Sequence, residues 1–577
     1  MLWIAAFTVP LLAALVLGCM RSRSSLSGVL TAIAALPALA LGWTGTGMDG
    51  FRIDGLFLGA EFNLDPFRAT LLAFTAFLWA VAGWFSGPYL AGDERRQRHD
   101  VFFLLSMAGN FGLIIAADVA TFYGFFVFMT FASYVLVIHN DTPQARRAAR
   151  VYIVMAIVGE ILLLSALFLA VHEAGTFALS DIREAVAASP FRDAIVALTL
   201  AGFGVKAGAV PLYFWLPLAH PVAPTPASAV LSGAMIKAGL IGWVHLLPLG
   251  AAPLPGWGTW MIGAGMFAAL WAAVVGSAQN HPKTILAYSS ISQMGVMTAL
   301  LGIALADDAL WPAAAPVLAF YAAMHGLAKG ALFLGTAVHP HGHYAQLLRL
   351  GGLGLAALAI AGAPPLAGFA AKYALKDLAE HAPGIWETLL PLFIGLSSFA
   401  TAFLLTRFLW AVATESPPGE NSTPPALSTG IPWTVAVAAA AAGPFLLNLK
   451  HGVAAAFPPL TAGSLFAALA PITLALAIAA LLMHRIAARP HKPLVPPGDF
   501  IVLIERFLAQ LHLAIRYGGR VNPHYEWLNI VQLSDRIIAF ETTKAWVDRV
   551  EARLETWIWV GFFFILFSVG FLGLLFL

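Results

Sequence analysis

Apolar runs of about 20 residues recur along almost the whole chain, and only short polar loops separate them. A helix needs about 20 consecutive apolar residues to cross the hydrocarbon core of a bilayer. Because backbone amides find no water there, such a pattern can fold only as a bundle of membrane-spanning helices. The pattern predicts roughly sixteen spans, with cores at 2–20, 26–43, 67–86, 101–117, 119–138, 151–171, 194–213, 226–248, 257–278, 284–304, 312–337, 351–375, 387–412, 430–448, 463–485 and 556–577.

The composition agrees with an all-α polytopic membrane protein and excludes several other classes. Hydrophobic residues make up 60% of the 577 residues and charged residues only 10%, whereas soluble domains carry about 25% charged residues. The chain has no basic tract, so we expect no nucleic-acid partner. The single cysteine, Cys19, excludes a disulfide framework and a multi-cysteine metal cluster. We therefore expect no cofactor in this chain, and we expect the first span to be a retained helix rather than a signal peptide.

The charges in the loops predict an orientation. Basic residues gather after the first, third, fifth and fifteenth predicted spans: Arg21, Arg23, Arg95, Arg96, Arg98, Arg146, Arg147, Arg150, Arg485, Arg489 and Lys492. All these positions are odd-numbered exits, so they share one side, which the positive-inside rule assigns to the cytoplasm. We therefore expect a multi-pass protein of the bacterial cytoplasmic membrane with both termini outside.

The most unusual apolar segment is residues 201–244. It carries two lysines, Lys206 and Lys237, on either side of a proline-rich break that includes Pro211. An ionisable group at membrane depth is costly and usually functional. A helix break is tolerated there only where protein or water satisfies the freed backbone groups. We interpret this stretch as half of a proton-transfer pathway.

A second break occurs at AGAPPLAGFAAK, where Pro364 and Pro365 lie within the twelfth predicted span and Lys372 follows them. Interrupted spans at corresponding places in two halves are the sequence sign of an inverted-repeat transporter with its site at the breaks. We expect helices four to eight and nine to thirteen to form two inverted five-helix repeats.

The predicted organisation has six parts. They are the N-terminal spans (1–100), a first repeat (101–250), a second repeat (251–413), two further spans (414–489), an amphipathic lateral segment (490–557) and an anchoring span (558–577). Residues 51–63 alternate weakly and predict a short exposed hairpin between the second and third spans. The charges of the lateral segment alternate in sign, which is typical of a helix at the membrane interface. We expect this segment on the cytoplasmic side.

Ionisable residues in or beside the spans are the candidates for carrying protons: Lys206, Lys237, Lys329, Lys372, His325, Glu160 and Asp118. Each also has a simpler explanation to be weighed. A lysine near a helix end can extend to the lipid headgroups. His325 could be a core histidine bonded to a backbone carbonyl, and Asp118 could be a helix cap. Apolar residues flank Glu160 on both sides, so a simple structural role explains it poorly.

A histidine cluster after the eleventh span does not predict a metal site. His339, His341 and His343 lie in the sequence VHPHGHY, where proline and glycine indicate a loop. No cysteine or carboxylate is adjacent to complete a ligand set. We expect no metal and no catalytic residue in this chain.

Four motifs resemble those of one family of membrane proteins. They are FGVKAGAVPLYFWLPLAHPVAPTPASAVLSGAMIKAGLIG, NHPKTILAYSSISQMG, AMHGLAKGALFL and APPLAGFAAK. Together they resemble the proton-translocating antiporter-like subunits of respiratory complex I, Mrp-type cation/proton antiporters and membrane-bound hydrogenases. The resemblance covers roughly residues 50–410 and implies about 14 core helices in two inverted repeats around a polar axis. The tail resembles the lateral helix of the largest such subunit of complex I, which braces neighbouring subunits.

The resemblance also assigns places to individual residues. In the order of the family's helices, the matched residues are Asp118 before helix five, Glu160 on helix six in some members, Lys206 on helix seven, Lys237 on helix eight, His325 and Lys329 on helix eleven, and Lys372 on helix twelve. The resemblance implies that these residues form the proton pathway.

One position departs from the family pattern. The family's helix-five glutamate usually precedes a tyrosine by seven residues, and here the tyrosine is Tyr134 and the earlier position is Val127. Leu218 also replaces an aspartate that often follows the sequence WLP. The carboxylate that would pair with Lys206 is therefore missing. Either Glu160 takes its place, or the first half-channel is modified or silent.

We therefore predict a proton-translocating subunit of a larger membrane complex, with sodium as the alternative ion. Its partners would be other membrane subunits and the lipid bilayer, and a redox or antiport partner would drive it, so the chain is not an enzyme by itself. Two other hypotheses remain open. The chain could be a self-contained secondary transporter for a cation or small solute, or a scaffold whose channel is vestigial.

Overall fold

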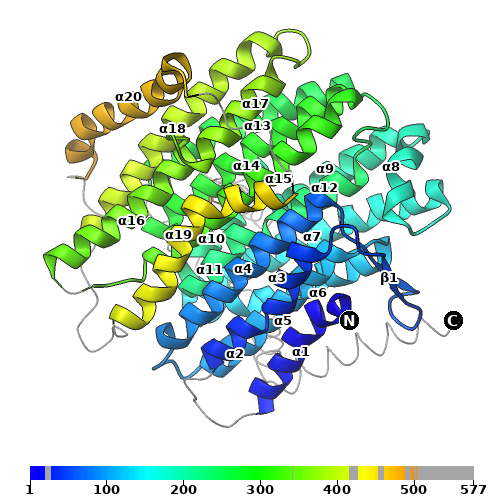
Figure 1. Cartoon of the computed structure of the whole chain (residues 1–577), viewed down its shortest axis with the longest axis horizontal. Coiled ribbons are helices and arrows are strands. Elements are labelled where there is room, and N and C mark those ends of the chain that lie inside the picture. The colour runs from blue at the N-terminus through cyan, green and yellow to red at the C-terminus, as the bar shows by residue number, and fades with distance from the viewer. Residues whose placement is uncertain are drawn as a thin grey trace, which may run out of the picture. The chain divides into compact units, whose positions relative to one another are not determined.

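Helices dominate the computed structural model, which describes residues 1–19, 27–340, 342–414, 426–451, 460–487, 495–499 and 502. In this described part, 13 helical segments are long and apolar enough to cross a membrane. Figure 1 shows most of them running side by side within the unit formed by residues 1–53 and 60–498. The prediction of an all-helical polytopic membrane protein is confirmed.

The first four helices pack against one another and against the helix that follows them. They are α1 (Leu2–Cys19), α2 (Ser27–Ile33), α3 (Leu36–Thr44) and α4 (Pro66–Tyr89). Helices α2 and α3 lie against α4, and α1 lies against α5 (Arg96–Ile115). The predicted hairpin is confirmed, because β1 (Phe51–Ile53) pairs antiparallel with β2 (Ala60–Phe62). The expectation that it is exposed holds for Arg52 but not for the second strand. Ala60 and Phe62 are buried, and Phe62 forms a bridge to Ala116 beyond the end of α5.

The next group of helices lies between residues 96 and 246. It comprises α5 (Arg96–Ile115), α6 (Val119–Val137), α7 (Pro143–Ala174), α8 (Leu179–Ala188), α9 (Arg192–Ala207), α10 (Trp215–Val222), α11 (Thr225–Val230), the π-helical turn η1 (Leu231–Met235) and α12 (Lys237–Leu246). α7 packs against both α6 and α9. The first candidate site lies among these three helices.

A further group follows between residues 255 and 487. It comprises α13 (Pro255–Ser277), α14 (Pro282–Ala306), the 3-10 turn η2 (Asp308–Leu310), α15 (Trp311–Gly335), α16 (His343–Ala361), α17 (Ala367–Ala379), α18 (Trp386–Thr414), α19 (Ala426–His451) and α20 (Ala462–Ala487). Figure 1 shows α14 and α15 near the middle of the picture and α20 at its edge. The segments 225–246, 282–306 and 308–335 each contain an apolar window of 18 residues that is entirely buried. Polar groups on these three segments must therefore find their partners within the protein.

The first predicted break is real, but its proline lies between helices rather than inside one. The expected span 194–213 ends early, because α9 stops at Ala207. Gly208 then takes a left-handed conformation with a φ of +71°, which is the usual way for a helix to end. Helix resumes only at Trp215. Pro211 lies in this connection, where its missing amide hydrogen breaks no helical hydrogen bond.

The second break has the same plan. The twelfth predicted span is interrupted, because α16 ends at Ala361 and α17 begins at Ala367. Gly362 ends α16 with a φ of +94°. Pro364 and Pro365 therefore lie in the connection between two helices, at the position of the expected break. The apolar run continues through both breaks, so hydropathy alone cannot locate the helix ends.

The expected sixteen spans exceed the 13 spanning segments of the described residues. α9 has 16 residues, too few to cross a bilayer alone, and the first turns of α5 carry charged residues. The predicted span 556–577, most of the lateral segment 490–557, the loop residue His341 and four of the basic loop residues (Arg21, Arg23, Arg489 and Lys492) lie outside the described residues.

Two of the arginine-rich loops meet at one end of the helices, as their odd-numbered positions predict. Arg95 and Arg98 both donate to the carbonyl oxygen of His139, at 3.3 and 2.9 Å. Arg146, in the first turn of α7, pairs with Asp141 at 2.6 Å. These contacts tie α5, α6 and α7 together at the same end. Which side of the membrane this end faces stays a prediction.

Candidate functional site

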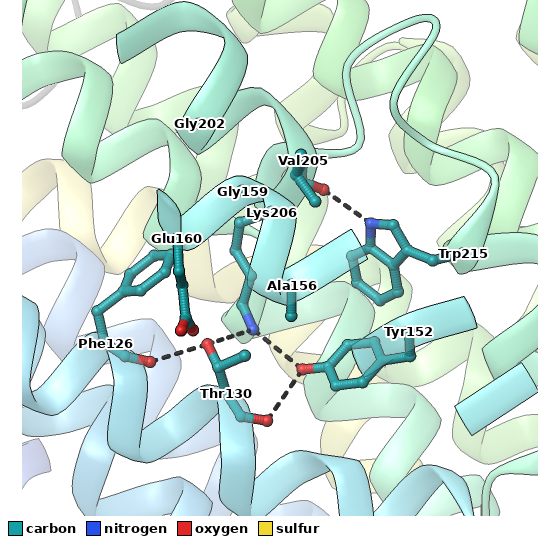
Figure 2. A pocket seen from close by; sticks show the side chains of 10 residues that line it. All are labelled: Phe126, Thr130, Tyr152, Ala156, Gly159, Glu160, Gly202, Val205, Lys206 and Trp215. Carbon is teal, nitrogen blue, oxygen red and sulfur yellow. Dashed lines mark hydrogen bonds between the residues drawn. The ribbon is translucent and has the colours of Figure 1, made fainter. Parts of the chain in front are cut away.

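The first candidate site lies at the end of α9. Lys206, in the last turn of that helix, is buried with 6% of its surface exposed. Its ammonium donates to Thr130 Oγ1 on α6 at 3.2 Å and to Tyr152 Oη on α7 at 3.1 Å. The rings of Phe126 and Tyr152 face the same nitrogen at 5.8 and 5.5 Å, and Figure 2 shows the arrangement. Hydroxyl groups and aromatic faces thus hold the charge.

The two hydroxyls belong to a larger network. Thr130 Oγ1 donates to the carbonyl oxygen of Phe126 at 2.8 Å, and Ser133 Oγ lies 2.6 Å from Tyr152 Oη. Sequence reasoning did not identify Thr130, Ser133 or Tyr152. Thr130 lies three residues after Val127 and therefore on a similar face of α6. That spacing was the available signal, because a hydroxyl one turn from a missing carboxylate can take over part of its role.

Glu160 faces the same cavity as Lys206. The cavity is lined by Phe126, Thr130, Tyr152, Ala156, Gly159, Glu160, Gly202, Val205, Lys206 and Trp215. It leaves about 20 Å³ for the centre of a water molecule, which is enough for one water. Among the described residues, Glu160 Oε1 has no hydrogen-bond partner, and Figure 2 shows the carboxylate turned towards the Lys206 ammonium. The two groups share a cavity in which one water molecule could join them.

Two glycines let α7 and α9 approach closely enough to make this cavity. A Cβ on Gly202 would lie 2.8 Å from the backbone nitrogen of Leu163, and one on Gly159 would lie 3.0 Å from Val205 Cβ. Small residues allow such contact between membrane helices. Gly159 directly precedes Glu160, so the closest contact of the two helices is next to the carboxylate.

Asp118 has the structural role that was its simpler explanation. It is the N-cap of α6, where its carboxylate accepts from the backbone nitrogen of Thr121 at 2.8 Å. It also accepts from the backbone nitrogen of Glu61 at 2.8 Å and so ties the hairpin to α6. Burial raises the pKa of its carboxyl group, and these hydrogen bonds oppose that shift. The cap is confirmed, and a role in proton transfer stays a prediction.

The second candidate site lies at the centre of the unit, between α12 and α15. Lys237 Nζ donates to His325 Nδ1 at 2.7 Å and to the carbonyl oxygen of Ser232 at 2.9 Å. Ser232 belongs to the π-helical turn that directly precedes Lys237, and such turns are frequent at functional sites. Lys329, one turn after His325 on α15, donates to the carbonyl oxygen of Leu286 on α14 at 2.9 Å. The sequence placed His325 beside Lys329, and the structure shows that its bonded partner is Lys237.

The third candidate site lies at the second break. Lys372 on α17 donates to the carbonyl oxygen of Ala361, the last residue of α16, at 2.9 Å. It also donates to Ser398 Oγ on α18 at 3.0 Å. The break thus supplies a carbonyl that no longer accepts a helical hydrogen bond, and the lysine satisfies it. Ser398 was not identified from the sequence.

The simpler explanation of the lysines as headgroup-seeking residues is wrong. The exposed fraction is 6% for Lys206, 1% for Lys237, 0% for Lys329 and 5% for Lys372. Their ammonium groups bind hydroxyls, carbonyls and one imidazole of this chain. The simpler explanation of His325 is also wrong, since its Nδ1 binds an ammonium rather than a backbone carbonyl.

Replacing Gly368 by alanine is expected to displace Lys372. A Cβ at Gly368 would collide with the carbonyl oxygen of Ala359, so α17 would have to move away from the end of α16. We expect the variant to be about 1–3 kcal/mol less stable, as measured by thermal unfolding of the purified protein. We also expect it to lose the proton movement that depends on Lys372. Gly354→Ala on α16 is the control, because a Cβ there meets nothing within 4 Å. Equal behaviour of the two variants would contradict this account of the break.

Comparison with known proteins agrees with this architecture. Residues 116–397 match the family model described as NADH:quinone oxidoreductase/Mrp antiporter, TM. Hydrogenase-4 component B of Escherichia coli (strain K12) is 28% identical over 340 residues, which cover 55% of this chain and 50% of the relative. NADH-quinone oxidoreductase subunit L of Mycobacterium tuberculosis (strain ATCC 25618 / H37Rv) is 33% identical over 343 residues, which cover 56% and 53%. The chain thus matches about half the length of these relatives.

Solved structures show the same fold. A chain of the Mrp complex from Dietzia sp. DQ12-45-1b superposes with a TM-score of 0.72 at 23% identity, covering 94% of this chain and 62% of that one. A chain of the membrane-bound sulfane sulfur reductase, an archaeal respiratory membrane complex, gives a TM-score of 0.64 at 19% identity, covering 82% and 99%. These likenesses extend the shared fold beyond the region of the family model.

Proposed function

Because the chain belongs to the family of antiporter-like membrane subunits, we propose that it conducts protons across a bacterial cytoplasmic membrane as one subunit of a multisubunit complex. The observation that carries the proposal is the set of four buried lysines, Lys206, Lys237, Lys329 and Lys372. Two lie at helix breaks and two lie in the enclosed centre. Ionisable groups at membrane depth mark ion pathways, and structural packing alone gives no reason for four of them.

The surroundings of the lysines favour the proton over sodium as the ion. An ammonium group can release a proton and take it back, whereas its charge repels a metal cation placed beside it. Lys237 and Lys329 are bonded to carbonyls and an imidazole, so a sodium ion at their carbonyl ligands would meet two nearby cationic groups. The same bonds suit a proton, because the imidazole can accept it.

The two breaks support an inverted-repeat arrangement. In each of them a helix ends at a glycine with positive φ, a proline-containing connection follows, and a shorter helix resumes. Lys206 precedes the first break and Lys372 follows the second. Residues 101–250 and 251–413 would each supply one half of the pathway, joined at Lys237, His325 and Lys329. The outside position of both termini belongs to the same proposal.

Partner subunits would supply the driving force. The relatives are named as a component of hydrogenase-4, as subunits of Na(+)/H(+) antiporters and as a subunit of NADH-quinone oxidoreductase. Several outer helices present large apolar side chains, among them Ile161 and Phe168 on α7, which are 62% and 67% exposed. Such faces suit lipid or neighbouring membrane subunits. The partner subunits of the complex would determine which reaction drives proton movement.

The complex that contains this chain, purified and reconstituted in liposomes, provides the test. A pH-sensitive dye inside the vesicles reports proton movement when the partner reaction is started. We expect Lys372→Ala to remove proton movement while the complex still assembles, because the variant breaks the bonds to Ala361 and Ser398. Wild-type proton movement in this variant would contradict the proposal. Coupled flux by the chain reconstituted alone would favour a self-contained transporter, and assembly without any proton movement in the wild type would favour a scaffold.

A further inference from the structure

Two serines join the central lysines across the helix interface. Ser232 Oγ, on the π-helical turn, lies 2.6 Å from Ser290 Oγ on α14. Ser290 Oγ donates to the carbonyl oxygen of Leu286 at 3.0 Å, and Lys329 Nζ donates to that same oxygen at 2.9 Å. At the other end, Lys237 Nζ donates to the carbonyl oxygen of Ser232 at 2.9 Å. The two bonded hydroxyls therefore lie between the lysines: Ser290 shares an acceptor with Lys329, and the backbone of Ser232 binds Lys237.

The four side chains Lys237, Ser232, Ser290 and Lys329 are all enclosed. Ser232, Ser290 and Lys329 have 0% of their surface exposed, and Lys237 has 1%. Lipid and bulk water therefore do not offer these groups an alternative partner. A hydroxyl can donate one hydrogen bond and accept others at the same time, whereas an ammonium can only donate. A pair of hydroxyls is thus the kind of group that can link two lysines that would otherwise repel each other.

We propose that the Ser232–Ser290 pair carries the proton between Lys329 and Lys237. The inference rests on the proposed function and names the groups that join its two halves. Lys329 and Ser290 Oγ already share one acceptor, so a small rotation of the side chain moves the ammonium from that carbonyl to the hydroxyl. The same holds for Lys237, which is bonded to the backbone of Ser232.

The transfer is balanced in protons and bonds. The N–H bond of the Lys329 ammonium breaks as an O–H bond forms on Ser290. The former Ser290 proton turns from the carbonyl oxygen of Leu286 to Ser232 Oγ and passes to Ser232. The former Ser232 proton forms a new N–H bond on the neutral amine of Lys237. Each serine ends as a neutral hydroxyl, and one positive charge has moved from Lys329 to Lys237. Rotation of the hydroxyls then resets the pair.

The competing route runs through His325. Its Nδ1 accepts from Lys237 at 2.7 Å, and Lys329 lies one turn further along α15. Within the described residues, however, His325 Nε2 has no hydrogen-bond partner. The imidazole can therefore exchange a proton with Lys237, but no hydrogen bond of the described residues joins it to Lys329. The serine pair is favoured because one of its hydroxyls shares an acceptor with Lys329.

The experiment compares serine variants in the reconstituted complex, with the dye measurement of proton movement. We expect Ser290→Ala and Ser232→Ala each to lower the rate about tenfold or more, as removal of a positioned proton-transfer group does. Ser290→Thr keeps the hydroxyl and is expected to restore most of the rate, which would show that the hydroxyl is the group that is needed. Ser289→Ala is the matched control, because the neighbouring Ser289 is also fully buried and its hydroxyl has no partner among the described residues.

Lys329→Ala separates failure of the relay from failure of the proposed function. If Lys329→Ala stops proton movement while Ser290→Ala and Ser232→Ala conduct at the wild-type rate, the relay is wrong and the His325 route takes its place. If Lys329→Ala itself conducts at the wild-type rate, the proposed function fails. If one serine variant does not assemble, the other breaks the same bond from the opposite helix and decides the question.

Discussion

Replacing Lys237 by methionine is expected to abolish proton movement in the assembled complex. Lys237 is bonded to His325 on one side and to Ser232 on the other, so the proposed path has to pass through it. Methionine has a similar length and flexibility but carries no proton. Because the variant removes a charged group that is costly to bury at membrane depth, we expect it to assemble. The rate should fall to the leak of protein-free liposomes.

Two further variants make this result specific. Lys237→Arg keeps a positive charge but does not release its proton near neutral pH, so it is also expected to stop proton movement. Lys450→Met removes an exposed lysine of α19 and is expected to conduct like the wild type. Proton movement at the wild-type rate in Lys237→Met would show that the path does not run through the centre. Activity of Lys237→Arg alone would show that the charge, and not the proton, is needed.

The sequence was sufficient to find the lysines and the approximate breaks. A charged residue within an apolar run is conspicuous because little else in such a run is polar, and Lys206, Lys237 and Lys329 all lie in apolar surroundings. Proline and glycine marked both breaks for the same reason. These features follow from hydrophobic periodicity and backbone chemistry, which are local properties. Local properties can be read without knowledge of which helices are neighbours.

The partners of the lysines could not be predicted in the same way. Thr130, Ser290 and Ser398 are ordinary residues of membrane helices, where a hydroxyl can bond to the carbonyl one turn earlier on its own helix. Only the packing of α6 on α9, of the π-helical turn on α14, and of α17 on α18 decides which hydroxyl meets which ammonium. The pairing of His325 with Lys237 has the same origin. Two residues 88 positions apart meet there, whereas the sequence favoured its neighbour Lys329.

The resemblance to the family implies a glutamate on helix five where this chain has Val127, and the structure changes how this difference is interpreted. From the sequence, its loss left Lys206 without a partner. The structure gives that lysine two hydroxyl acceptors and places the carboxylate of Glu160 at the same cavity. Two hydroxyls can hold an ammonium in place, but they do not balance its charge. A carboxylate that one water molecule joins to the ammonium can hold it in place and balance its charge. It can therefore also take up the proton of the ammonium.

Glu160→Gln is therefore expected to lower proton movement about tenfold or more, since it removes a proton acceptor and keeps the size and shape of the side chain. Adding Val127→Glu to this variant should recover a large part of the rate, because position 127 lies three residues before Thr130 and can offer Lys206 a carboxylate from α6. Glu173→Gln, near the end of α7 and away from the lining of the cavity, is the control. Wild-type rates in Glu160→Gln together with a silent Lys206→Ala would mean that the hydroxyls suffice. Wild-type rates in both would mean that protons do not use the first half of the chain at all.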